Sequence, residues 1–308
     1  MNKEIFREYD IRGIYNKELF DKDAYTIGKS YGSILQEKYD RKVCIVGQDN
    51  RLSSPALAKN LINGLLDSGI DVIDLGICTT PMFSYACLKT NTIFGIMVTA
   101  SHNPKEYNGF KFTFDNLGLA RGKQVYDFRD YTLNGKFLSG NGNLSNLNIL
   151  PYYSSLIEKN INMNQRKIKV VVDPGNGTTS LFAENIYKMF NNLDVTMINN
   201  VSDPNFPNHH PDPNVAENMI QLQNKVLEIK ADIGIAFDGD GDRVGVVNNL
   251  GEIVSTEYLM ILAIRSLINK TDNKTSVITN NGNIVTILFY ILPQTHLKSP
   301  MLILYRFF

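Results

Sequence analysis

Three aspartates stand at alternate positions in the segment Asp238-Gly-Asp-Gly-Asp-Arg243. They follow an apolar run that predicts a strand over 231–237, so they lie just past its carboxyl end, where open α/β sheets bind ligands. Asp238, Asp240 and Asp242 would repel one another strongly without a cation between them. Because carboxylate oxygens suit Mg²⁺ better than zinc or copper, we predict a magnesium site at these three residues.

A second polar segment, Thr99-Ala-Ser-His-Asn-Pro-Lys-Glu-Tyr-Asn-Gly-Phe-Lys111, also follows an apolar run. We expect one loop that carries a hydroxyl, an imidazole and an ammonium group. Ser101 would act as a nucleophile, His102 or a neighbouring base would take its proton, and Lys111 would attract a phosphate. The structural alternative is that Ser101 caps a helix and that Asn103-Pro104 begins a turn.

Two other loop types compete for the aspartate segment. An EF-hand needs Gly at position 6 and Glu at position 12, but those positions hold Arg243 and Asn249 here, and a predicted strand precedes the loop. The EF-hand interpretation therefore fails. A phosphatase with an aspartate nucleophile has D-x-D-x-[TV] after a strand. The fifth position is Asp242 in this chain, so this interpretation fits poorly, but it stays open as an alternative.

Strand-length apolar runs alternate with helix-length segments in two successive stretches of the chain. The period of the apolar residues predicts strands over 42–47, 71–76, 93–98, 167–173, 193–199 and 231–237, and helices over 55–68, 80–88, 177–191 and 215–229. A Gly/Asn-rich stretch, 134–148, looks like an exposed connection between the two. We therefore expect an α/β fold of tandem duplicated β-α-β-α-β domains, with mixed, mostly parallel sheets covered by helices. The predicted boundaries are 1–150 and 151–254.

The last part of the chain, 255–308, has a different composition. The 36 residues after Asp272 contain no Asp or Glu, although 31 acidic residues occupy the rest, and 283–308 has no clear period or cap. One interpretation is the short, buried end of an incomplete third domain. The other is an aberrant sequence that has left its ancestral reading frame.

Composition excludes a disordered tail, a collagen-like fibre and a small protein held together by disulfides. The chain has 308 residues with 43% hydrophobic and 20% charged residues, and 31 basic residues balance 31 acidic ones. This composition is globular, and the neutral net charge gives no reason to expect a nucleic-acid or membrane partner. The run 284–292, apolar except for Thr286, is far shorter than the ~20 residues that span a bilayer. Three scattered cysteines and a charged N-terminus lead us to expect a reduced, cytoplasmic protein.

Taken together, the two polar segments resemble the phosphoserine loop and the magnesium loop of the α-D-phosphohexomutases, the phosphomannomutases and phosphoglucomutases. Phe6-Arg-Glu-Tyr-Asp-Ile-Arg-Gly13 resembles the N-terminal F-R-x-Y-D-I-R-G of that family, and Asp173-Pro-Gly-Asn-Gly177 and His209-His-Pro-Asp-Pro213 also look like family sequence. The resemblance covers residues 1 to about 275. The Tyr-Asn-Gly-Phe at 107–110 is more similar to the mannose/glucose mutases than to the glucosamine branch, and it leaves mannose or glucose open.

The resemblance implies conversion of a hexose 6-phosphate to a hexose 1-phosphate by way of a phosphoserine and a hexose 1,6-bisphosphate intermediate. Ser101 would carry the phosphoryl group. Asp238, Asp240 and Asp242, with a phosphate oxygen on Ser101, would hold Mg²⁺. The reaction centre would be lined by groups that bind phosphate and a candidate for proton transfer or positioning: Tyr9, Arg12, Lys111 and Arg243, and His102. Arg12 and Lys111 would act in catalysis as well as in binding.

Two further family patterns are missing. Family members have a third domain with a G-E-x-S-G loop for sugar hydroxyls and a fourth domain with a loop of Arg, Ser, Asn and Thr for the substrate phosphate. Here Gly251-Glu252 is followed by Ile-Val, and the fourth pattern does not occur. We therefore expect an incomplete third domain, no fourth domain and little mutase activity. A non-catalytic Mg²⁺-binding remnant stays open as an alternative, and the oligomeric state is not predicted.

Overall fold

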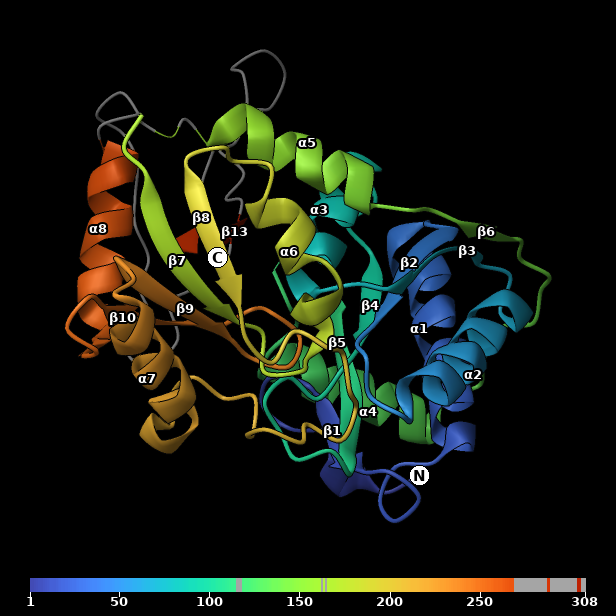
Figure 1. Ribbon diagram of the computed structural model, residues 1–308. Coiled ribbons are helices and arrows are strands. Elements are labelled where there is room, and N and C mark those ends of the chain that lie inside the picture. The colour runs from blue at the N-terminus through green and yellow to red at the C-terminus, as the bar shows by residue number, and fades with distance from the viewer. Residues whose placement is uncertain (115–117, 162, 164, 269–286, 289–303, 306–308) are drawn as a thin grey trace.

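The computed structural model describes residues 1–114, 118–161, 163, 165–268, 287–288 and 304–305. The first part of the chain forms a six-stranded mixed sheet (Figure 1). β2 pairs in parallel with β3 and β4, and β3 with β6, whereas β5 runs antiparallel between β4 and β1. In spatial order the strands are β1 (Ile11–Ile14), β5 (Tyr107–Thr113), β4 (Gly95–Val98), β2 (Val43–Gln48), β3 (Asp71–Ile77) and β6 (Leu144–Asn146).

Helices cover both faces of this sheet. One apolar cluster joins the sheet to α1 (Asp21–Tyr39), α2 (Ser54–Asp67) and α4 (Lys123–Asn134). α1 and α2 cross closely at Gly28. A Cβ atom at this position would lie 2.2 Å from the Leu61 carbonyl oxygen, so the absence of a side chain permits the close crossing. On the other face lies α3 (Thr80–Lys89), which begins at a Thr79 cap followed by a proline in its first turn. A 3₁₀ turn, η1 (Lys3–Ile5), precedes β1.

The second part of the chain forms a five-stranded mixed sheet in the order β11-β10-β9-β7-β8. β7 (Ile168–Asp173) pairs in parallel with β8 (Leu193–Met197) and β9 (Ile233–Phe237), and β10 (Val244–Asn248) and β11 (Ile253–Val254) continue antiparallel. α7 (Ile220–Ile229), after the 3₁₀ turn η3 (Ala216–Met219), packs on one face. η2 (Thr178–Leu181) and α6 (Ala183–Tyr187) follow β7.

The helix α5 (Leu150–Asn160) links the two sheets. Its Tyr153 and Ile157 share one buried cluster with Ile45 and Phe83 of the first part and with Ile186 of the second. Figure 1 shows α5 lying beside α3. The two parts of the chain therefore have one continuous interior along this seam.

Beyond residue 254 the structure describes α8 (Thr256–Ile268) and the two short paired strands β12 (Ile287–Leu288) and β13 (Leu304–Tyr305). The predictions for the acid-poor end fall mostly on residues outside the described ranges. In the described part of the chain, no helix is long and apolar enough to cross a membrane.

The expected α/β fold with mixed sheets is confirmed, and every predicted strand is present. The second sheet is not mostly parallel, because β10 and β11 add two antiparallel pairings to the two parallel ones. Two predicted helices differ. The helix expected over 177–191 is a 3₁₀ turn and a short α6, because Phe182 has φ −128°, outside the helical range. The helix over 215–229 begins as a 3₁₀ turn. The stretch 134–148 is mostly exposed as expected, but it adds the edge strand β6 to the first sheet.

Candidate phosphoryl-transfer site

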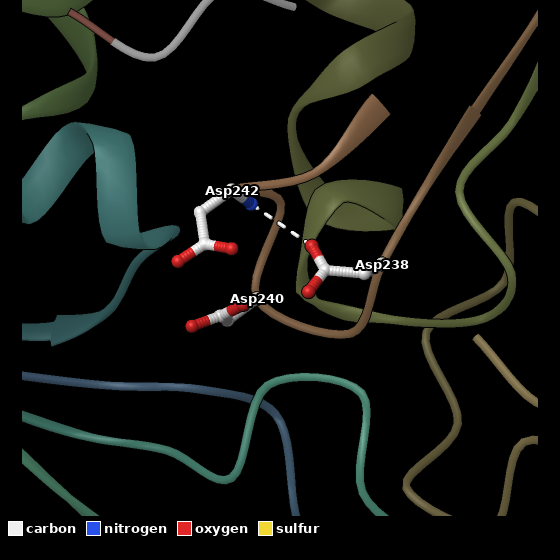
Figure 2. Close-up of side chains that lie close together, drawn as sticks. All are labelled: Asp238, Asp240 and Asp242. Carbon is white, nitrogen blue, oxygen red and sulfur yellow. Dashed lines mark hydrogen bonds between the residues drawn. The ribbon is translucent and has the colours of Figure 1, made fainter. Parts of the chain in front are cut away.

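The three aspartates lie on the tight connection between β9 and its antiparallel neighbour β10. One ligand oxygen from each of Asp238, Asp240 and Asp242 lies within 4.8 Å of the others, and all three side chains are buried. Figure 2 shows them side by side on one loop, with the Asp242 backbone N–H donating to Asp238 at 2.9 Å. The Arg243 N–H donates to the same Asp238 oxygen at 3.0 Å, which fixes the loop.

Positive charge and hydroxyl groups surround these carboxylates. Lys111 Nζ lies 2.6 Å from a carboxylate oxygen of both Asp240 and Asp242. The Thr80 hydroxyl donates to Asp240 at 2.6 Å. Burial, and then the charge of Asp240, raise the pKa of Asp238 to about 7. Burial and the repulsion from Asp240 therefore disfavour the charged form of Asp238, and a cation bound at the cluster would offset both effects.

The donor set fits a hard divalent cation. Every candidate ligand is a carboxylate oxygen, and the three buried groups converge. Among the described residues this is the one cluster of three or more acidic, His or Cys side chains with ligand atoms this close. The predicted aspartates therefore form a cluster that is suited to a metal ion.

Ser101 lies past the carboxyl end of β4 and reaches this cluster from the other sheet. Its hydroxyl donates to Asp238 at 2.7 Å, and its backbone N–H donates to the Thr99 hydroxyl at 2.9 Å. Ser101 has φ +52°, a left-handed conformation that is unfavourable for a residue with a side chain. A Cβ on Gly239 would lie 2.5 Å from the Ser101 carbonyl oxygen, so only glycine permits this approach. The two polar segments thus meet.

Ser101 does not cap a helix, because the chain continues through a turn into β5. The alternative of a turn at Asn103-Pro104 is correct, since the Tyr107 N–H donates to the Pro104 carbonyl. The expectation that Lys111 shares the loop with Ser101 is wrong. Lys111 lies in β5 opposite Met97, and only the pleat of that strand brings its side chain to the aspartates.

His102 lies beside the serine, with Nδ1 3.4 Å from the Ser101 hydroxyl oxygen. Burial, and then the positive charge of Arg243, lower the pKa of His102 to about 4. Its imidazole is therefore neutral at pH 7. A neutral ring can accept a hydrogen bond from a hydroxyl, but it is a weak base.

The remaining predicted residues lie at different depths. Arg12, in β1, is buried and donates to the Asn103 amide oxygen at 2.7 Å and to Asp10. Arg243 lies 3.7 Å from Asp212 and 3.9 Å from Asp238. Tyr9, in contrast, is 59% exposed and lies at the surface.

The sequence did not single out Arg51, which follows β2 in a loop of polar residues. Arg51 is buried and forms an ion pair with Asp49 at 3.1 Å. It also donates to the Ser101 carbonyl oxygen at 2.8 Å. The one available signal was position, because this loop also follows the carboxyl end of a parallel strand.

Two segments of family-like sequence pack against each other behind the metal loop. His209 Nε2 lies 3.0 Å from an oxygen of the buried Asp173. Burial lowers the pKa of His209, but the hydrogen bond and the charge of Asp173 outweigh it and hold the pKa above 6.5. The Cβ of a residue in place of Gly175 would lie 3.3 Å from the His209 ring. These segments therefore brace the second sheet next to the site.

Comparison with known proteins gives matches over most of the chain. Residues 3–126 match the family profile described as phosphoglucomutase/phosphomannomutase, alpha/beta/alpha domain I, and residues 151–251 match domain II of the same family. A curated phosphomannomutase/phosphoglucomutase of Pseudomonas syringae is 43% identical over 258 residues, which is 84% of this chain and 55% of that protein. A phosphoglucomutase of Neisseria gonorrhoeae is 37% identical over 272 residues, 88% and 58% of the two chains.

A crystal structure of a phosphoglucomutase/phosphomannomutase family protein from Burkholderia thailandensis superposes with a TM-score of 0.81 at 34% identity, over 88% of this chain and 60% of that one. The chain thus spans a little over half the length of the curated relatives it matches. Its two sheets, and the loops that meet between them, correspond to domains I and II of these proteins. By sequence and by fold, the chain belongs to the phosphoglucomutase/phosphomannomutase family, the α-D-phosphohexomutases.

Proposed function

We propose that the chain carries the phosphoryl-transfer centre of a phosphohexomutase that interconverts the 6-phosphate and 1-phosphate of mannose or glucose. The observation that carries the proposal is the 2.7 Å hydrogen bond between the Ser101 hydroxyl and Asp238, which joins the serine loop to the aspartate cluster across two sheets. The family membership supports it. The free, buried cysteines at positions 44, 78 and 87 suit a cytoplasmic protein.

In the proposed reaction Ser101 is phosphorylated and its phosphoryl group passes to a free hydroxyl of the sugar. A P–O bond forms to the sugar oxygen as the bond from phosphorus to Ser101 Oγ breaks, and the proton of the sugar hydroxyl ends on Ser101 Oγ, which becomes a free hydroxyl again. The product is a hexose 1,6-bisphosphate. Its other phosphoryl group then returns to Ser101 with the opposite changes, which regenerates the phosphoserine and releases the isomeric monophosphate.

The side chains around Ser101 suit the charge of this transfer. Asp238, Asp240 and Asp242 would hold Mg²⁺, which supplies positive charge to the phosphoryl oxygens when it is bound. Lys111 and Arg243 add fixed positive charge beside the same loop. His102 is neutral with a pKa of about 4, so we assign it a positioning role beside the serine hydroxyl rather than that of a strong base.

Arg12 and Tyr9 complete the proposed centre on its open side. Arg12 holds the Asn103 side chain of the serine loop, and it keeps a guanidinium group next to the path of an incoming phosphate. The exposed Tyr9 would contact the substrate only at the rim.

The test is transfer of a phosphoryl group from α-glucose 1,6-bisphosphate to the purified chain in the presence of Mg²⁺, followed by peptide mass mapping. We expect one phosphoryl group on Ser101 and none on the Ser101→Ala variant. A protein that stays unmodified under these conditions would refute the proposal. A hydroxylamine-labile phosphate on Asp238 would instead favour a phosphatase with an aspartate nucleophile.

A further inference from the structure

The Arg51 guanidinium uses all of its hydrogen-bond donors. Nε donates to Asp49, and the two terminal nitrogens each donate to two backbone carbonyl oxygens. A guanidinium has five N–H groups in one plane, so none is left over. Arg51 is 1% exposed, and the Asp49 carboxylate balances its charge. Such complete use of a buried cation indicates a site that is built around arginine.

The four carbonyl groups belong to the serine loop, which is the loop that begins at Ser101, and to the first residue of β5, Tyr107. Their distances from the guanidinium nitrogens are 2.8 Å for Ser101, 2.7 Å for Asn103, 2.7 Å for Pro104 and 3.1 Å for Tyr107. Arg51 therefore fixes the loop from the reactive residue to the first residue of β5. No side-chain atom of the loop takes part, so the contacts depend on the course of the backbone alone.

The second sheet's part of the chain holds Arg51 from the other side. The ring of Phe206 lies over the guanidinium, with 5.5 Å between the guanidinium carbon and the ring centre. The neighbouring Asn50 donates to the Asn176 carbonyl and to the Ser202 hydroxyl, both at 2.9 Å. The loop after β2 thus grips the serine loop and, at the same time, the part of the chain that carries the aspartates.

We propose that Arg51 is a positioning residue for phosphoryl transfer. It holds the Ser101 peptide in its left-handed conformation against Gly239, so that the hydroxyl points at Asp238. Arg51 acts through Ser101 and does not contact the reacting atoms. The kinetic consequence of this inference rests on the proposed function. The positioning of the serine loop by Arg51 rests on the contacts alone.

Lysine is the substitution that separates charge from geometry. Arg51→Lys keeps a positive charge beside Asp49, but an ammonium group has three donors in a tetrahedral arrangement and cannot reach four carbonyl oxygens in one plane. Leu61→Ala, a truncation of a buried residue in α2, serves as a control that lowers stability without contact to the serine loop. Both variants are compared at a temperature where each is folded.

The kinetic test is a single turnover from α-glucose 1,6-bisphosphate to Ser101, with the rate constant separated from the dissociation constant. We expect Arg51→Lys to lower the rate constant by about 10²-fold, because misplacement of a reacting group by ~1 Å has that effect, and to leave the dissociation constant nearly unchanged. Phe206→Leu, which keeps the guanidinium and removes the ring, should slow transfer less. A wild-type rate constant in Arg51→Lys, or an equal loss in Leu61→Ala, would overturn the proposal.

A second measurement on the protein without ligand keeps the inference separate from the proposed function. Hydrogen exchange should become faster in the 99–108 segment of Arg51→Lys and stay unchanged in the α1 segment. If wild-type protein accepts no phosphoryl group, the proposed function fails, while the exchange experiment still judges the grip of Arg51. Unchanged exchange at 99–108 would overturn the positioning role.

Discussion

Mg²⁺ should stabilise this protein through the aspartate cluster, and Asp240→Asn should remove most of that effect. Two unit charges no more than 4.8 Å apart repel by at least about 3.5 kcal/mol at an effective dielectric constant near 20. A divalent cation at a similar separation attracts each carboxylate about twice as strongly. Loss of one carboxylate from the set should therefore weaken Mg²⁺ binding by at least ~100-fold, or about 2.7 kcal/mol.

These figures translate into melting temperatures. A ligand at 100 times its dissociation constant stabilises the folded state by about 2.7 kcal/mol, and each kcal/mol shifts the Tm of a protein of this size by about 2–4 °C. We expect Mg²⁺ to raise the Tm of the wild-type chain by roughly 5–11 °C at that concentration. At the same concentration, Asp240→Asn should gain only about 0.4 kcal/mol, or about 1–2 °C.

The assay is a thermal melt at increasing MgCl₂, with NaCl at equal ionic strength as the reference. The quantity compared is the increment caused by Mg²⁺, since Asp240→Asn also breaks the contact with Lys111 and so changes the starting Tm. Asp194→Asn, an exposed acid in β8, is the matched control and should keep the full increment. An increment in Asp240→Asn equal to that of Asp194→Asn would refute the reasoning.

Three further predictions concern the contacts around the site. The pKa of His209 lies above 6.5 in the folded state, so the stability from its ion pair with Asp173 is fully present below pH 6.5 and is lost as the pH rises through the folded pKa. The Tm difference between wild type and His209→Gln should therefore shrink from pH 6 to pH 8.5. A constant difference would contradict this. Gly239→Ala should abolish phosphorylation of Ser101, because its Cβ would lie 2.5 Å from the serine carbonyl oxygen; unchanged labelling by mass mapping would show that the loops need not touch. Asn50→Ala should lower the free energy of unfolding in urea by about 1–3 kcal/mol, since three side-chain hydrogen bonds between the parts of the chain are lost, and an unaltered midpoint would argue against that link.

The position of each polar segment at a ligand-binding edge was predictable from the residues, whereas their meeting across two sheets was expected only from the family resemblance. Each follows a buried strand, and parallel strands bring the loops at their carboxyl ends to one edge of a sheet. Ser101 and Asp238 are 137 residues apart, yet the rule placed both at ligand-binding edges. The aspartate cluster was predictable because three alternating carboxylates leave few structural explanations.

The contributions of Lys111 and Arg51 were harder to predict. Lys111 lies in β5, a strand whose alternating pattern was hidden within a motif that looked like one continuous loop. Arg51 depends on four carbonyl groups 50 to 56 residues away, and backbone carbonyls carry no signal in a sequence. The lengths of the helices after β7 were misjudged because local backbone breaks, as at Phe182, depend on packing.

The shared interior beneath α5 has a practical consequence for dissecting the protein. A cut near residue 150 would leave Ile45 and Phe83 without the cover of Tyr153 and Ile157, so the first part should be insoluble or only partly folded by itself. In the intact chain, by contrast, the serine and the aspartates keep a fixed relative position. The seam that buries these apolar residues also fixes the spacing between the two loops. Under the proposed function, the opening that admits a sugar phosphate would involve elements outside this seam.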